Sequence, residues 1–288
     1  MKNLKLAIAV SSALSVFASI QAMADWENLP AAGVSVGSDT SAYILCNPTG
    51  NFGWGRGASA DVQPSSITDA CAVLPLIDLL APDANFTGAD LVPKESRTVA
   101  IYMDSYTGGN PVDIGTFTEY VWQREVQEDV YECIYGMKVV LKNADYNDDE
   151  SGTQNFEVND MARKGWNGKM IDVAYSTVPA AAFSTYRIGR TFTSVKYGSG
   201  SGYVDQPPTG LGAKPAITYT QNADLESDWV DFTTLVHVGT TDASGMQYIR
   251  TSCTAEDFST VSDAIRLRQT SRDGQPAIEV EVEGFIPN

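Results

Sequence analysis

Asp145, Asn147 and Asp149 place side-chain oxygens at every second position of a short polar segment, with further acidic residues beside them. Calcium takes about six to eight oxygen ligands in proteins, and a turn of this composition can bring several of them to one ion. The EF-hand pattern is not met, because the sixth position counted from Asp145 is not glycine and Glu157 lies one residue beyond the twelfth. The segment therefore predicts a calcium site, and a solvated acidic turn between two strands is the alternative interpretation.

Catalytic side chains are harder to assign. His237 is the only histidine, so a Ser-His-Asp hydrolase would need it as its base, but no G-x-S-x-G or other nucleophile motif is present. A glycan hydrolase would use two carboxyl groups that meet only in space, and Asp104, Glu119, Glu132 and Asp231 lie in or beside expected strands. The sequence does not rank these four, so a secreted carboxylate-dependent glycan hydrolase is kept as a second alternative function.

Trp54 is the most prominent aromatic residue, because glycines surround it in the segment 51–57. Such a ring can project from a loop and stack on a sugar, or it can fold over the core. The first interpretation predicts a carbohydrate-binding module, with Trp54 as a ligand-binding residue and a surface glycan as the partner.

Residues 1–24 have the organisation of a cleavable secretory signal peptide. Lys2 and Lys5 form a positive start, a mostly apolar stretch spans residues 6–20, and the small-residue motif Ala22-Met23-Ala24 ends the segment. We expect export from a bacterial cytoplasm to the periplasm, the cell surface or the medium. A spanning helix needs about 20 apolar residues, and no later stretch provides them, so we expect no transmembrane anchor.

The chain is strongly acidic, with a formal net charge of −17. Cleavage after residue 24 would remove two lysines and no acidic residue, which leaves 17 basic and 36 acidic side chains and a charge of −19. A surface of this charge repels phosphates, so nucleic acid is excluded as a partner. The excess of carboxylates favours divalent cations without selecting one.

Four cysteines, Cys46, Cys71, Cys133 and Cys253, lie in the part of the chain that would be exported. An even number of cysteines in an exported protein indicates disulfides, here two. A thiolate metal site is disfavoured, because the C-x-x-C spacing is missing. Three pairings are open, and the order of the segments favours Cys46 with Cys71 and Cys133 with Cys253.

Alternating apolar and polar residues, rich in β-branched and aromatic types, predict many short strands. These runs cover residues 42–46, 98–103, 115–123, 139–141, 186–197, 216–219, 229–238, 246–251 and 277–282. Turn residues separate them, so we expect an all-β fold, a β-sandwich of jelly-roll or Ig-like type. The last run should be a half-buried strand, with Ile278 and Val280 facing the core and Glu279 and Glu281 facing solvent.

Helix is expected at one or two short places only. Residues 66–80 begin with a pattern that resembles a capping box and contain Pro75, which would shorten or kink the helix. A second short helix is expected near Asn159.

We expect residues 25–288 to form one domain. The glycine- and proline-rich segment 198–214 is either a long surface loop, which we favour, or a boundary between two halves.

Three blocks of sequence carry a family resemblance. Residues 115–122 read Gly-Thr-Phe-Thr-Glu-Tyr-Val-Trp, residues 131–141 read Tyr-Glu-Cys-Ile-Tyr-Gly-Met-Lys-Val-Val-Leu, and residues 156–163 read Phe-Glu-Val-Asn-Asp-Met-Ala-Arg. These blocks resemble the pattern of the bacterial choice-of-anchor F proteins. The resemblance implies an exported surface protein of undefined activity and supplies no catalytic residues.

Together these features favour a non-enzymatic, secreted or cell-surface protein with a structural or adhesive role. Edge strands such as residues 277–282 could pair with another copy and build a filament or matrix, although their glutamates would oppose pairing unless a cation or a basic partner intervened. Calcium is the one cofactor that the sequence suggests.

Overall fold

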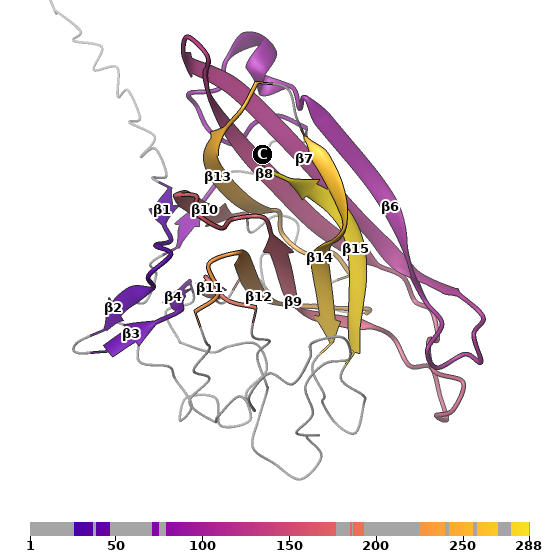
Figure 1. Ribbon diagram of the computed structural model, residues 1–288. Coiled ribbons are helices and arrows are strands. Elements are labelled where there is room, and N and C mark those ends of the chain that lie inside the picture. The colour runs from indigo at the N-terminus through magenta and orange to yellow at the C-terminus, as the bar shows by residue number, and fades with distance from the viewer. Residues whose placement is uncertain are drawn as a thin grey trace, which may run out of the picture.

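The computed structural model describes residues 26–36, 39–46, 71–74, 79–176, 185, 187–192, 225–239, 242–255, 258–269 and 278–287. Within these residues the chain forms two β-sheets that pack face to face, with a separate two-stranded sheet beside them (Figure 1). The prediction of an all-β sandwich is confirmed.

The seven-stranded sheet has the spatial order β1-β10-β13-β8-β7-β6, and β5 pairs with β10 outside this path. All pairs are antiparallel except β5 with β10, which is parallel. Its strands are β1 (Glu27–Asn28), β5 (Ala72–Val73), β6 (Glu95–Met103), β7 (Val112–Gln127), β8 (Val130–Leu141), β10 (Ile171–Tyr175) and β13 (Gln247–Cys253).

The six-stranded sheet is antiparallel throughout and has the order β15-β14-β9-β12-β11-β4. Its strands are β4 (Tyr43–Leu45), β9 (Glu157–Lys164), β11 (Arg187–Gly189), β12 (Trp229–His237), β14 (Ser259–Gln269) and β15 (Ile278–Ile286). The strands β2 (Val34–Val36) and β3 (Asp39–Ser41) form the two-stranded sheet.

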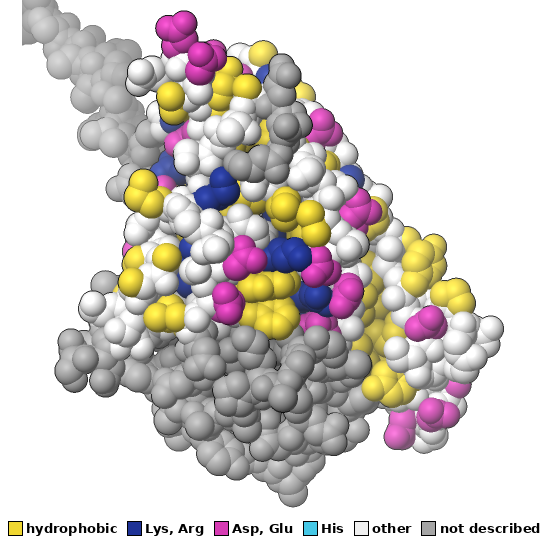
Figure 2. Space-filling view, in the orientation of Figure 1, with side chains coloured by type: hydrophobic (Ala, Val, Ile, Leu, Met, Phe, Trp, Pro, Cys, Tyr) yellow, Lys and Arg dark blue, Asp and Glu magenta, His cyan; other side chains and the backbone are white. Residues whose placement is uncertain are grey.

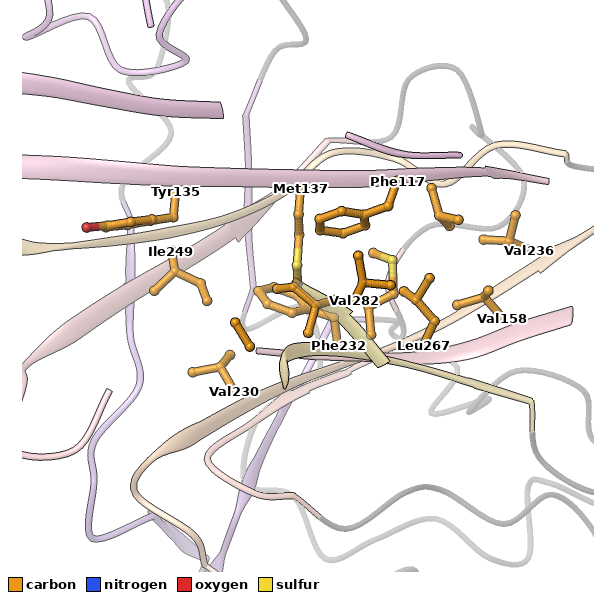
Figure 3. Close-up of a cluster of buried hydrophobic side chains, with 14 of the residues drawn as sticks. Phe117, Tyr135, Met137, Val158, Val230, Phe232, Val236, Ile249, Leu267 and Val282 are labelled. Atoms are coloured by element: carbon orange, nitrogen blue, oxygen red, sulfur yellow. The ribbon is translucent and has the colours of Figure 1, made fainter. Parts of the chain in front are cut away.

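The main core lies between the two large sheets. Figure 3 shows Phe117 and Met137 of the seven-stranded sheet meeting Phe232, Leu267 and Val282 of the six-stranded sheet. The first four of these side chains are at most 1% exposed. Alternate residues of each strand reach this layer, as the period of two in the sequence requires.

Most of the predicted strand runs coincide with observed strands. The runs at 98–103, 115–123, 139–141, 229–238, 246–251 and 277–282 overlap β6, β7, β8, β12, β13 and β15, and the run at 42–46 contains β4. Within 186–197, the strand β11 ends at Gly189 and residues 190–192 are not strand. The run at 216–219 and the segment 198–214 lie outside the described residues, as does the leader.

The predicted helix near Asn159 is wrong. Asn159 lies in β9, a central strand between β12 and β14, where pairing on both sides overrides the local helix preference of Met161 and Ala162. The helix predicted over residues 66–80 is contradicted where the chain is described, because Ala72–Val73 form β5 and residues 79–80 form a turn and a bend. The one helical element among the described residues is the 3₁₀ helix η2 (Gly88–Leu91).

Two disulfides join Cys46 to Cys71 and Cys133 to Cys253, the pairing that segment order favours. Cys46 directly follows β4 and Cys71 directly precedes β5, so the first bond links the six-stranded sheet to the seven-stranded sheet. The second bond joins the neighbouring strands β8 and β13. In the described part of the chain, no helix has the length and apolar character of a membrane span.

Candidate functional site

The predicted calcium residues lie in the loop after β8. Asp145 Oδ1 accepts hydrogen bonds from the backbone N–H groups of Asn147 and Gln154, at 3.2 and 3.1 Å, and Asn147 Oδ1 accepts one from Asp149 N–H at 3.1 Å. These oxygens therefore already shape the turn. Among the described residues, no three His, Cys, Asp or Glu side chains come together as a metal site, and calcium binding here stays a prediction.

Among the described residues, the other predicted side chains do not assemble into one site. Trp54 lies outside the described residues. His237 is the last residue of β12 and is half-buried, with its Nδ1 atom 3.3 Å from the carbonyl oxygen of Val238.

The four carboxyl groups considered for glycan hydrolysis lie apart. Glu119 points into the sandwich, Asp231 lies on the opposite face of the six-stranded sheet, and Glu132 is held by Arg124 on the outer side of β8 at 2.8 Å. Asp104 is in the exposed turn after β6. These four residues therefore provide no facing pair on either side of a substrate.

The residues that the structure does bring together lie on the outer face of the six-stranded sheet. Strand pairing aligns two polar rows across this sheet, separated by the apolar row that faces the core. The first polar row runs through Arg187, Thr233, Asp160, Arg268 and Glu279. The second contains Tyr43, Gly189, Asp231, Ala162, Arg266 and Glu281.

We call Tyr43, Asp160, Arg187, Asp231, Thr233, Arg266, Arg268 and Glu279 the outer-face cluster. Alternation of polar and apolar residues normally marks a polar face that meets solvent. Here the polar face is buried: Asp160, Asp231, Thr233 and Arg268 are each 0% exposed. Buried charges are stable only when they are paired, so the contacts among these side chains decide whether the sheet is stable.

Ion pairs and hydrogen bonds cross the cluster from strand to strand. Arg268 Nε binds Glu279 Oε2 at 2.8 Å, and Arg187 Nε donates to Thr233 Oγ1 at 2.9 Å. The Thr233 hydroxyl lies between two carboxyl groups, 3.4 Å from Asp160 Oδ1 and 3.5 Å from Asp231 Oδ2. The sequence-based expectation that Glu279 faces solvent is therefore wrong, since its side chain is fully buried between arginines.

Burial dominates the electrostatics of the cluster. It raises the pKa of the Asp231 carboxyl well above its ordinary value, the neighbouring Asp160 raises it further, and Arg268 and Arg187 oppose the change. Burial likewise raises the pKa of Glu279 against the influence of Arg268, and it raises the pKa of Tyr43. Arg187 also stacks on the Tyr43 ring, with 3.6 Å between the guanidinium carbon and the ring centre.

A second charged group lies inside the sandwich and joins the two sheets. Glu119 of β7 binds Arg163 of β9 at 2.9 Å, and both side chains are 0% exposed. Glu119 also accepts a hydrogen bond from Phe285 N–H of β15 and lies 3.5 Å from Arg97 of β6. Arg97 in turn binds Glu283 of β15 at 3.3 Å. We call Arg97, Glu119, Arg163 and Glu283 the inter-sheet cluster.

Neither cluster was predicted from the sequence. The signal that could have found them is the presence of arginines at alternate positions of apolar strands, as in the segment 265–269, together with acids at alternate positions of other strands. Lys and Arg are almost never fully buried unless they are paired, so such strands imply partners elsewhere in the chain.

Comparison of the chain with models of known protein families, with curated proteins and with solved structures found no match. The resemblance to choice-of-anchor F proteins therefore stays a prediction.

Proposed function

We propose that this protein is a non-enzymatic, exported structural or adhesive module that associates with further copies of itself. The observation that carries the proposal is that the two sheets are cross-linked on both sides of the sandwich. The Cys46–Cys71 disulfide links them where β4 and β5 lie, and the inter-sheet cluster links them where β6 and β15 lie.

Cross-links of this kind suit a protein that must keep its shape outside the cell. A disulfide limits the conformations of the unfolded chain, and such bonds persist in oxidising compartments. This agrees with the signal peptide that we read in residues 1–24. The medium, the cell surface and the periplasm all satisfy these conditions.

The side that would meet another copy is the one formed by β6 and β15, the edge strands of the two sheets. Strand β6 pairs with β7 only, and β15 pairs with β14 only, among the described strands. The ion pair between Arg97 and Glu283 shows that these two end strands lie next to each other. Edge strands that are not covered present unpaired backbone groups and are templates for pairing with another chain.

Charge on this side is largely neutralised within one copy. Residues 98–103 of β6 carry no charge, and Tyr102 is 56% exposed on this strand. The exposed glutamates of β15, Glu281 and Glu283, bind Arg266 and Arg97. Figure 2 shows basic and acidic side chains interleaved over the region of β14 and β15. The arginines thus take the place of the basic partner that the glutamates would otherwise need.

Sedimentation velocity over a wide concentration range, followed by electron microscopy, tests the proposal. We expect the mature wild-type protein to form dimers or larger assemblies and Ala100→Lys, on β6, to remain monomeric, because a lysine blocks strand addition at an edge. Val140→Lys is the matched control, because Val140 is also exposed but lies on the interior strand β8. A wild-type protein that stays monomeric at high concentration, with and without calcium, would refute self-association.

A further inference from the structure

We propose that the first step of assembly is a two-fold symmetric dimer in which the β6 strands of two copies pair antiparallel, with Ala100 opposite its own copy. This inference rests on the self-association proposed above and specifies it, because it names one edge strand and one register. Such a dimer joins two seven-stranded sheets into one continuous sheet, and its two-fold interface closes on itself.

Strand β6 is accessible to a second copy. It is the last strand of the seven-stranded sheet among the described strands, and Figure 1 shows it at the outer margin of the sandwich. Its side chains alternate: Ile101 and Met103 are buried in the core, whereas Thr98, Ala100 and Tyr102 are exposed on the outer face of this sheet. None of the three exposed side chains is charged, so none of them prevents another strand from pairing here.

Charge favours β6 over β15 as the strand that pairs with its own copy. The chain carries a formal net charge of −17, so two copies repel each other unless they meet where acidic side chains are absent. Residues 98–103 of β6 contain no charged side chain. The other edge strand, β15, carries the exposed glutamates Glu281 and Glu283, and a pair of β15 strands would bring like charges together.

The side chains of β6 favour one register. Residues that lie opposite each other in an antiparallel pair point to the same face of the sheet, where their side chains interact. With Ala100 at the two-fold axis, Tyr102 of each copy lies opposite Thr98 of the other, and an aromatic residue beside a β-branched one is a favourable cross-strand pair. Moving the axis by one residue would place Tyr102 opposite Ser96 or Ala100 instead.

The same register fits the length of the strand. Residues 97–103 all lie opposite residues of β6, which ends at Met103. A lysine at position 100 would lie directly opposite its own copy at the axis, and like charges in that position are destabilising. This dimer therefore gives a specific reason why Ala100→Lys should remain monomeric.

Engineered disulfides test the dimer. Opposite Cα atoms of an antiparallel pair are about 4.5–5.5 Å apart, within the range of about 4.4–6.8 Å that a disulfide spans. In the mature protein treated with oxidised glutathione, we expect Ala100→Cys to form a disulfide-linked dimer on non-reducing gels. Val140→Cys is the matched control, because Val140 is also exposed but lies on the interior strand β8, and this variant should form far less dimer.

A mixture of two variants tests the register. Thr98→Cys and Tyr102→Cys should each form little dimer alone and much more when they are mixed, because the register places these two positions opposite each other. Circular dichroism confirms that each variant is folded, and peptide mapping identifies the cysteines that are joined.

The outcomes separate this inference from self-association itself. A wild type that assembles in sedimentation velocity while Ala100→Cys forms no more dimer than Val140→Cys would overturn the β6 dimer and leave self-association standing. Dimers of Thr98→Cys alone that equal those of the mixture would overturn the register. A wild type that stays monomeric at high concentration would overturn both proposals.

Discussion

Replacing Glu119 by glutamine should destabilise the protein strongly, because it leaves the buried Arg163 without its counterion. Glu119 binds Arg163 and Arg97 and accepts a hydrogen bond from Phe285 N–H, while its side chain is 0% exposed. Burial raises the pKa of this carboxyl, and Arg163, the Phe285 N–H group and Arg97 oppose that rise. Contact with two arginines favours the ionised form. The variant removes its charge and almost none of its volume.

The expected loss follows from the environment of Arg163. Removing one partner of a buried ion pair costs about 3–5 kcal/mol. Arg163 keeps its hydrogen bond to the Phe285 carbonyl and its contact with the Tyr135 ring, and the glutamine can still accept from Phe285 N–H. We therefore expect the lower end, about 3 kcal/mol. For a chain of this size, that corresponds to a fall in melting temperature of roughly 6–12 °C.

Urea unfolding followed by circular dichroism and tryptophan fluorescence measures this change. With an m value of about 3 kcal/mol per M, the midpoint should fall by about 1 M. The double variant Glu119→Leu/Arg163→Met should lose much less than Glu119→Gln, because replacing both members of a buried pair is often nearly neutral. Asp113→Asn, in a partly exposed ion pair, should lose less than about 1 kcal/mol.

Two outcomes would contradict this prediction. A loss for Glu119→Gln as small as that for Asp113→Asn would mean that the pair does not hold the sheets together. A double variant at least as unstable as Glu119→Gln would mean that packing volume, and not unpaired charge, causes the loss.

Three further predictions concern other parts of the sandwich. The double variant Cys133→Ala/Cys253→Ala should lose about 5 kcal/mol, since this disulfide spans 120 residues, and calorimetry without reductant would measure the change. Gly189→Ala should lose about 1–3 kcal/mol in urea unfolding, because a Cβ atom there would lie 2.4 Å from the buried Tyr43 ring; no loss would show that the ring can move. Burial of Asp83 opposes ionisation, but hydrogen bonds and Arg250 lower its pKa overall, so its contribution should be present at neutral pH and vanish as the pH falls below about 4. Unfolding of the wild type and Asp83→Asn should therefore differ at pH 7 and converge in acid.

Strands in which apolar and polar residues alternate could be predicted from their own residues. In β12, Val230 and Phe232 alternate with polar residues, and this pattern needs only the pleat of a strand to place the apolar side chains in one layer. Strands β7 and β15 could be predicted in the same way. Strand β9 could not, because two polar residues followed by Met161 and Ala162 break the alternation and the local sequence favours helix.

The class of the fold, the number of disulfides and the expectation of export could be inferred from the amino-acid sequence, because each depends on local pattern, residue count or composition. The folded protein was needed to show that the polar face of the six-stranded sheet is buried and that Asp160, Asp231 and Arg268 meet there. A charged side chain on a strand is predicted to face solvent as long as its counterion is not known. For Arg268 the nearest carboxyl groups come from β15, the next strand of the chain, and from β12, which lies beyond β9 and comes near only when the whole sheet folds.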